Sequence, residues 1–198
     1  MEETGAADAA ARESGPARES DVPPELDSVP DALPELDAEA MFLCAALWAR
    51  DRDPVGTVAE LVRPGDFERP AHALLYTMWC EQVRAGRPHD AASISARLTD
   101  AGTEQAPRTV HTALRGITTL GAEPAALGWY AIDVVTAAYR RSYRQVAQAI
   151  AHAAAAAPTD ELFPILLRHG TRQRGESRRL AQLRRRLGAD PEEAAPGG

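Results

Sequence analysis

The sequence of 198 residues contains no lysine, so all 22 of its basic residues are arginine. The absence of lysine excludes a Walker A P-loop, in which a lysine contacts the β- and γ-phosphates of a nucleotide. It also excludes a lysine Schiff base and a lysine general base. Alanine and arginine are both favoured by GC-rich coding, so the bias supports only these negative conclusions.

Cysteine and aromatic residues are also scarce. Cys44 and Cys80 both lie in apolar helical stretches, where we expect them to be buried and reduced. Two cysteines without a pattern of nearby histidines do not indicate a zinc site. Aromatic residues make up 5% of the chain and alanine is abundant, which favours closely packed helices over an aromatic-rich sheet.

Long hydrophobic runs are missing as well. No window of about 18 apolar residues exists, so the sequence predicts no membrane span. The first residues, MEETGAADAAARESG, are acidic and lack the apolar core of a secretory signal. We therefore expect a cytoplasmic protein with no membrane partner.

The acidic residues are concentrated at the N-terminus. Residues 1–40 carry twelve acidic and two basic residues, whereas residues 41–157 carry eleven and twelve. Residues 1–36 have few large apolar side chains and five prolines between Pro16 and Pro34, so we predict a disordered acidic tail. Residues 188–198 form a second predicted tail.

The remaining sequence predicts an all-α fold, a compact bundle of about five or six helices at residues 37–123 followed by a long helical hairpin at residues 124–187. Asp37 is a good N-cap for a helix whose stretch 41–49 is apolar all round and is expected to be buried on most sides. A short helix is predicted at residues 56–62. Asp90 should cap a helix that runs to about Asp100, with Gly102 as its stop. No segment alternates with period two, so no sheet is expected.

The most clearly delimited helix of the bundle lies within residues 63–86, RPGDFERPAHALLYTMWCEQVRAG. Pro70 suits its first position, because the missing N–H would be unpaired there in any case. Gly86 is placed as a C′ glycine. Apolar residues in between recur at steps of three and four, which predicts one buried face. The stretch has no set of catalytic residues and is expected to be a core helix.

The predicted hairpin starts after Pro124 with a helix from about residue 125 to residue 157. Its apolar residues form a nearly heptad seam. The seam consists of Ile132, Val135, Tyr139, Tyr143, Val146 and Ile150. It fits packing within the hairpin, or a homodimer face in which Tyr139 and Tyr143 are natural anchors. Pro158 should end this helix, Thr159 is a candidate N-cap for the next, and Gly170 and Gly175 are expected to weaken the middle of that second helix.

Arginines gather on both predicted hairpin helices. The candidate basic face comprises Arg140, Arg141, Arg144, Arg178, Arg179, Arg184, Arg185 and Arg186. Such a set fits a solvated surface, contact with nucleic-acid phosphates, or contact with an acidic partner, which includes the chain's own acidic arm. Aromatic residues are nearly absent from residues 164–198, so base stacking is not expected there.

No pattern in the sequence indicates an active site, a metal site or a bound cofactor. His72 lies one turn into the helix that Pro70 opens, and no carboxylate or cysteine stands at a compatible spacing. We therefore expect it to be hydrogen-bonded to the neighbouring loop. The other four histidines are scattered, and no two carboxylates are placed for acid–base chemistry.

The order of these signals resembles the N-terminal domain of the replicative DNA helicase DnaB over residues 37–187. The segments DAEAMFLCAAL, FERPAHALLY and the Gly86–Asp90 connector correspond to segments of that family, as do Trp129-Tyr130 and Arg140-Arg141 on the long helix. Cys44 stands where the family has glycine, and Arg69 replaces its capping aspartate. The main matching positions are Asp37, Glu39, Leu43, Leu47, Phe67, Pro70, Ala71, His72, Leu75 and Asp90.

The resemblance implies an all-α bundle whose helical hairpins pair, which would make this chain a homodimer or higher oligomer. It also implies a replicative helicase, a primase or a loading protein as partner. No P-loop or strand–helix alternation of a RecA-like motor is present, so we expect no helicase activity and no enzyme. A small nucleic-acid-binding protein that uses the arginine-rich helix is the alternative function.

Overall fold

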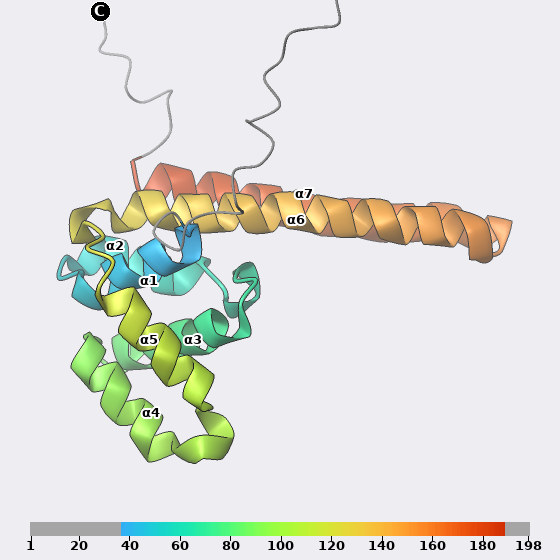
Figure 1. Cartoon of the computed structure of the whole chain (residues 1–198). Helices are drawn as coiled ribbons and strands as arrows, with labels where there is room; N and C mark the ends of the chain where they lie inside the picture. Colours follow the sequence, from blue (N-terminus) through green and yellow to red (C-terminus); the bar gives the residue numbers. More distant parts are fainter. Residues whose placement is uncertain (1–36, 189–198) are drawn as a thin grey trace, which may run out of the picture. The chain divides into compact units, whose positions relative to one another are not determined.

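The computed structural model describes residues 37–188, and within them all regular structure is helical, as the sequence predicts. The predicted tails at residues 1–36 and 189–198 lie outside the described residues. The bundle contains α1 (Ala38–Trp48), α2 (Arg52–Leu61), α3 (Pro70–Arg84), α4 (Ala91–Gln105) and α5 (Arg108–Thr118). Short 3₁₀ turns, η3 (Pro64–Asp66) and η4 (Pro124–Ala126), precede α3 and α6. The hairpin consists of α6 (Leu127–Ala156) and α7 (Thr159–Arg186) (Figure 1).

Helix α1 lies at the centre of the bundle and packs against α3, α5 and α6. Its run from Phe42 to Leu47 is buried on every side, which explains why the sequence shows no polar face there. Asp37 caps its first turn by accepting a hydrogen bond from the backbone N–H of Glu39. Trp48 departs from the expectation of a buried helix, because it is 46% exposed.

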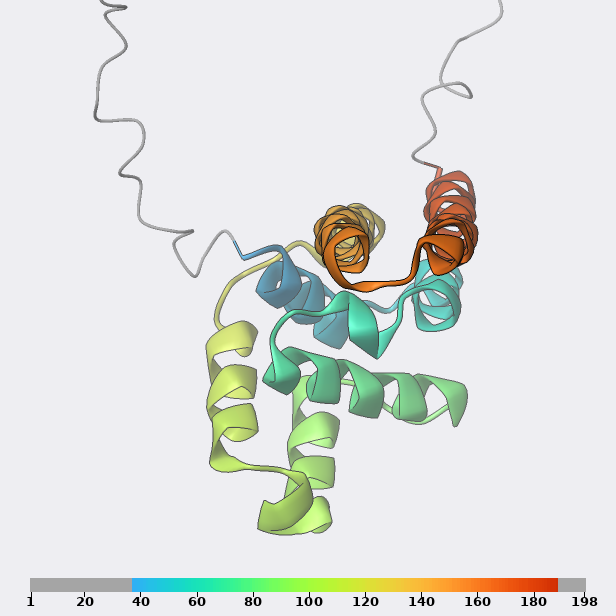
Figure 2. The same ribbon diagram turned by 90° about the vertical axis from the view of Figure 1, so that its right-hand side faces the viewer.

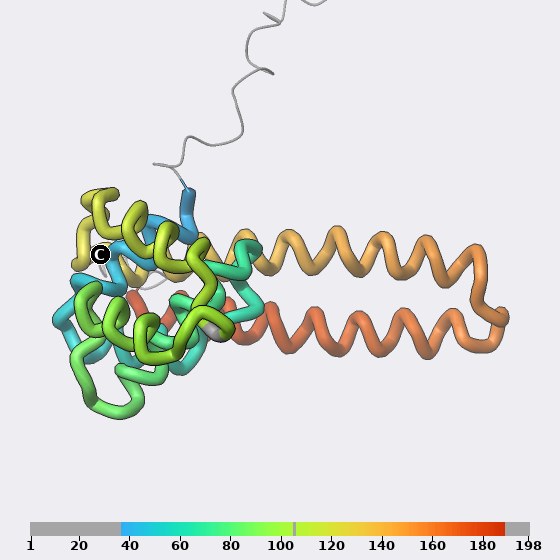
Figure 3. The backbone as a smooth tube through the Cα atoms, turned by 60° about the horizontal axis from the view of Figure 1, so that its bottom comes forward, coloured from blue at the N-terminus to red at the C-terminus, as the bar shows by residue number. Residues whose placement is uncertain are grey.

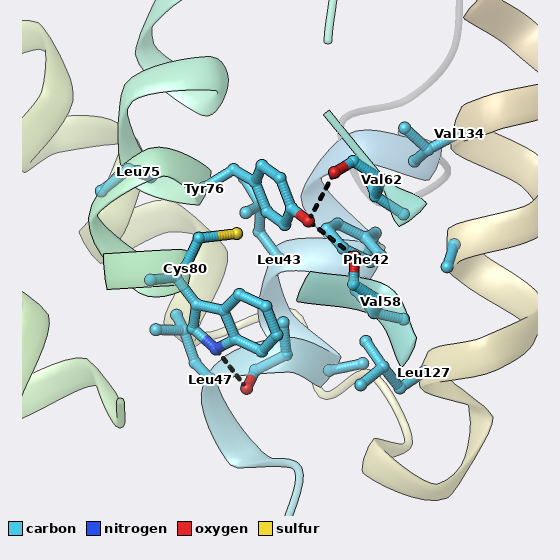
Figure 4. Packing of buried hydrophobic residues seen from close by; sticks show 14 of the residues in the cluster. Phe42, Leu43, Leu47, Val58, Val62, Leu75, Tyr76, Cys80, Leu127 and Val134 are labelled. Carbon is cyan, nitrogen blue, oxygen red and sulfur yellow. Dashed lines mark hydrogen bonds between the residues drawn. The ribbon is translucent and has the colours of Figure 1, made fainter. Parts of the chain in front are cut away.

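Four aromatic side chains fasten α3 to α1 and α2. The rings of Phe42, Phe67, Tyr76 and Trp79 form consecutive contacts with centroids 5.0–5.7 Å apart. The Tyr76 hydroxyl donates toward the backbone oxygens of Val58 and Val62, which lie at the end of α2 (Figure 4). The indole N–H of Trp79 donates to the backbone oxygen of Ala46. These polar contacts pair groups that would otherwise be buried without partners.

The two hairpin helices run antiparallel and side by side, and their far halves extend beyond the bundle (Figure 3). Viewed end-on, both lie on the same side of the bundle (Figure 2). Gly128 of α6 lies against Leu187, since a Cβ added to Gly128 would be 3.4 Å from the Leu187 side chain. The Ser142 hydroxyl donates to the side-chain oxygen of Gln173. These two contacts define the register of α6 against α7. α6 therefore begins beside the end of α7.

Two predicted helix starts were wrong, for local reasons. α2 begins at Arg52 rather than at residue 56, because Asp51 caps it through the backbone N–H of Asp53. Pro158 is the N-cap of α7, so Thr159 is its first helical residue. α7 continues through Gly170 and Gly175, since packing against α6 supports its middle. Gly102 does interrupt α4, with a φ of 74°.

None of the helices within residues 37–188 combines the length and apolar content that crossing a membrane requires.

Candidate interaction surfaces

The apolar seam predicted on α6 divides into a buried half and an open half. Ile132 and Val135 are buried in the bundle core, so their packing lies within the chain. Further along, Val146 and Ile150 are only half-buried and Tyr143 is 50% exposed. The self-association face predicted for the whole seam is therefore wrong for its first two residues, which have no surface left to offer.

A second apolar face, which the sequence analysis did not single out, lies on the first turns of α7. Phe163 is 70% exposed, Leu166 50% and Leu167 58%. The three occupy positions i, i+3 and i+4, so they share one side of the helix. Their spacing was visible in the sequence, but only the structure shows that α6 does not cover them.

A groove between α6 and α7 joins these two apolar regions. Its cavity is about 400 Å³ and includes Tyr139, Tyr143, Val146, Leu166 and Gln173. The two tyrosine hydroxyls are 3.0 Å apart, and this hydrogen bond raises the pKa of Tyr143. Gln173 is buried and accepts from the Ser142 hydroxyl through its side-chain oxygen, whereas its amide nitrogen has no partner within the described part of the chain.

Three arginines of the predicted basic face bond to groups of the bundle and hold the hairpin on it. Arg179 makes a bidentate ion pair with Asp66, with both N–O distances 2.7 Å, and its side chain is only 10% exposed. It also bonds Glu176. Arg141 donates to the backbone oxygen of Asp66, and Arg186 pairs with Glu60. The prediction of a single outward basic face is therefore wrong for Arg141 and Arg179, whereas Arg186 stays exposed although it is paired.

Charge attraction in this network outweighs the cost of burial. Burial alone would raise the pKa of the Glu176 carboxyl, but hydrogen bonds and attraction from Arg179 and Arg63 bring it below its ordinary value. Hydrogen bonds and attraction from Asp66 and Glu176 keep the Arg179 pKa above its usual value in spite of burial. Both groups are therefore charged at neutral pH.

The remaining arginines of the predicted basic face have no carboxylate partner among residues 37–188. Arg184 is half-buried, and the others are exposed. These residues are Arg140, Arg144, Arg178, Arg184 and Arg185.

His72 has a carboxylate partner, contrary to the sequence-based expectation. Its Nδ1 lies 2.9 Å from Oε2 of Glu39, which comes from α1 rather than from the neighbouring loop. Glu39 also accepts the backbone N–H groups of Glu68 and Arg69. This contact joins residues 33 positions apart, and sequence spacing could not reveal it.

The same cluster does not favour a metal ion. Ligand atoms of Asp37, Glu39 and His72 lie within 4.8 Å of one another. However, the Glu39 carboxylate already accepts three hydrogen bonds, and the Arg69 guanidinium pairs with Asp37 at 2.6 Å. A cation would have to displace these donors, so the arrangement acts as a clamp between α1 and the start of α3.

The other positions that carry the family resemblance are structural. Pro70 is the first residue of α3, Ala71 is half-buried, and Asp90 caps α4 through the N–H of Ser93. The remaining apolar positions of the motif are buried in the core, namely Leu43, Leu47, Phe67 and Leu75.

Comparison of this chain with known proteins finds two similarities. The family model for the DnaB-like helicase N-terminal domain matches residues 32–126. The crystal structure of the N-terminal domain of DnaB helicase from Mycobacterium tuberculosis matches with 27% sequence identity and a TM-score of 0.56. That match covers 68% of this chain and 92% of the other chain.

Proposed function

Because this chain carries a DnaB-like helicase N-terminal domain at residues 32–126, we propose that it is a non-catalytic interaction module of DNA replication. In this role it self-associates through its hairpin and docks on a replicative helicase, a primase or a loading protein. No P-loop can form without lysine, so the proposal assigns the chain no nucleotide hydrolysis. A replication role implies a cytoplasmic location.

The exposed apolar face on α7 is the observation that carries this proposal. Phe163, Leu166 and Leu167 are large apolar side chains on the first turns of α7 that remain 50–70% exposed. Exposed apolar residues on one side of a helix are typical of protein–protein contacts. The adjoining groove at Tyr143 extends the face onto α6. A second hairpin packed against it would remove this apolar surface from water.

The test is a size measurement by light scattering on the full chain and on a variant with Phe163→Asp and Leu167→Asp. We expect the full chain to be a dimer or larger and the variant to be a monomer, because burying two carboxylates in an apolar interface is strongly unfavourable. A variant with Gln148→Asp and Ala155→Asp is the matched control. Both positions are exposed on α6, so this variant adds the same charge and should keep the wild-type size. A monomeric wild-type chain would count against self-association.

Docking needs a separate test. The full chain is immobilised and exposed in turn to a purified replicative helicase, a primase and a loading protein. Retention of at least one of them is the expected result. If all three pass without retention, the docking part of the proposal fails even where self-association is observed.

Nucleic-acid binding remains the second candidate function, and the exposed unpaired arginines are the observation that favours it. Arg140 and Arg144 lie one turn apart on α6, and Arg178 and Arg185 are exposed on α7. This function predicts DNA binding that weakens steeply with salt and is reduced by Arg140→Ala with Arg144→Ala. Binding that is absent at low salt would exclude it.

A further inference from the structure

Two adjoining cavities lie at an end of the bundle, away from the hairpin groove. One is about 560 Å³ and is lined by the end of α1 and the start of α4. The other is about 580 Å³ and is lined by the start of α2 and the end of α3. Arg50, Pro88 and His89 line both cavities, so the two are parts of one depression, which we call the Trp48 groove.

The floor of the Trp48 groove is apolar. Trp48 and Leu47 line the first cavity, and Val55 and Val83 line the second. Trp48 is about half exposed, although every residue from Phe42 to Leu47 is buried. A partly open indole beside aliphatic side chains forms a place where a large apolar side chain of a ligand can be covered.

The ridge between the two cavities is held rigidly. Nε2 of His89 lies 3.1 Å from the backbone oxygen of Ala49, so this nitrogen carries the proton and donates. The His89 ring meets Trp79 edge-on, at an angle of 84°. The connector between α3 and α4 therefore keeps its place against the end of α1, and the groove is formed before any ligand arrives.

The rim of the groove is basic. Arg50, Arg52 and Arg87 line it, all three are exposed, and none pairs with a carboxylate among the residues that the structure describes. Asp90 is the acidic residue among those that line it, and its carboxylate accepts the N–H of Ser93, which lowers its pKa. The start of α4 adds the positive end of a helix dipole at Ala91 and Ala92.

We propose that the Trp48 groove binds an acidic peptide segment that carries a bulky apolar side chain. The apolar side chain covers Trp48, and the flanking carboxylates meet the arginine rim. A guanidinium binds a carboxylate with two parallel hydrogen bonds. The three unpaired arginines around the apolar floor can therefore each bind a carboxylate of the ligand. A basic or neutral segment would leave the arginines without partners.

The residues that line the groove also favour an acidic peptide over a single-stranded nucleic acid. Base stacking on a single strand needs successive aromatic side chains along a basic groove. Here Trp48 is joined on the floor by aliphatic residues and by proline. The other ring that lines the groove, His89, is engaged edge-on with Trp79 and bonded to the backbone oxygen of Ala49. The inference goes beyond the proposed function, since none of the residues that line the groove belongs to the hairpin.

The test uses the full chain and a short fluorescein-labelled peptide in which aspartate and glutamate alternate with leucine and phenylalanine. Fluorescence polarisation should show saturable binding to the wild-type chain. Arg50→Glu combined with Arg87→Glu should weaken binding at least about tenfold, because both rim charges then repel the peptide. Trp48→Ala should weaken it independently, through loss of the apolar contact. A peptide with lysine in place of the acidic residues should not bind.

Arg108→Glu combined with Arg115→Glu is the matched control. Both residues are exposed on α5, so the net charge changes equally while the groove stays intact. Equal weakening by the two double variants would overturn the proposal, as would binding of a single-stranded oligonucleotide, but not the peptide, at the groove. If circular dichroism shows that the variant with Arg50→Glu and Arg87→Glu is unfolded, the milder variant with Arg50→Gln and Arg87→Gln takes its place. The monomeric hairpin variant should keep its peptide affinity, which separates this test from the test of self-association.

Discussion

At the scale of single residues, the arginines of this chain divide into two classes that composition does not distinguish. Arg179 is enclosed with Asp66 and is part of the fold, whereas Arg178, the preceding residue, is exposed. A helix turns by about 100° per residue, so neighbouring arginines face different surroundings. The sequence predicts where charge accumulates, and only the packed structure shows which charges remain for partners.

The Asp66–Arg179 pair should be one of the strongest single contributors to stability. Asp66→Ala leaves a buried guanidinium without its bidentate partner, and we expect the free energy of unfolding to fall by about 3–5 kcal/mol. Glu60→Ala removes the partner of Arg186 from an exposed pair and should cost at most about 1 kcal/mol. Urea unfolding followed by circular dichroism measures both. Similar losses in the two variants would contradict this ranking.

The Glu39 clamp makes a pH-dependent contribution. Burial would raise the pKa of Glu39, but the hydrogen bond with His72 and the N–H groups of Glu68 and Arg69 together lower it. A carboxyl with a depressed folded pKa stabilises the fold above its unfolded pKa, near 4.5, and this stabilisation is lost as pH falls through the folded value.

Glu39→Gln should therefore destabilise the chain by about 1–3 kcal/mol at neutral pH. The difference from wild type should shrink as the pH falls below that of the unfolded carboxyl. Urea midpoints across the acid range measure the effect. A difference that stays constant with pH would mean that the charge of Glu39 is not involved.

At the scale of elements, α1, α3 and α6 could be predicted because their apolar residues recur with helical period and their ends carry strong signals. Asp37 caps α1 and Pro70 is the first residue of α3, as expected. The apolar seam on α6 predicted which residues share one side of the helix. It did not predict which of them are buried, because that depends on how far the bundle extends along α6. The contact between Glu39 and His72 and the exposure of Phe163 depend on tertiary packing, so no local pattern indicates them.

The glycines of α7 and α4 provide a test at this scale. Gly170 and Gly175 lie inside a continuous helix, and an added Cβ would meet nothing within 4 Å. Replacing either by alanine should raise the free energy of unfolding by about 0.5–1 kcal/mol, because alanine restricts the unfolded chain more than glycine does. Gly102→Ala is the control. Its positive φ should make that change destabilising, and thermal unfolding should show the opposite sign.

At the scale of the whole molecule, the proposed contacts use different surfaces and respond differently to salt. Self-association through Phe163, Leu166 and Leu167 is apolar and should change little between about 0.1 and 1 M salt. Peptide binding at the Trp48 groove relies on an exposed arginine rim and should weaken over the same range. Sedimentation and polarisation measured on the same samples separate the two. If both weakened in parallel, the contacts would not be independent.

Because Arg179 holds the hairpin near its base, a small tilt at this residue displaces the far end of the hairpin by a larger distance. Arg179 lies twenty residues after Thr159, so the turn between α6 and α7 lies roughly 30 Å beyond the anchor at 1.5 Å per residue. A tilt of about 5° at the anchor would displace that turn by roughly 2.6 Å over this length. Small changes in packing around Asp66 are thereby magnified at the far end. The reach and aim of the hairpin are set at its base, well away from the residues that would meet a partner.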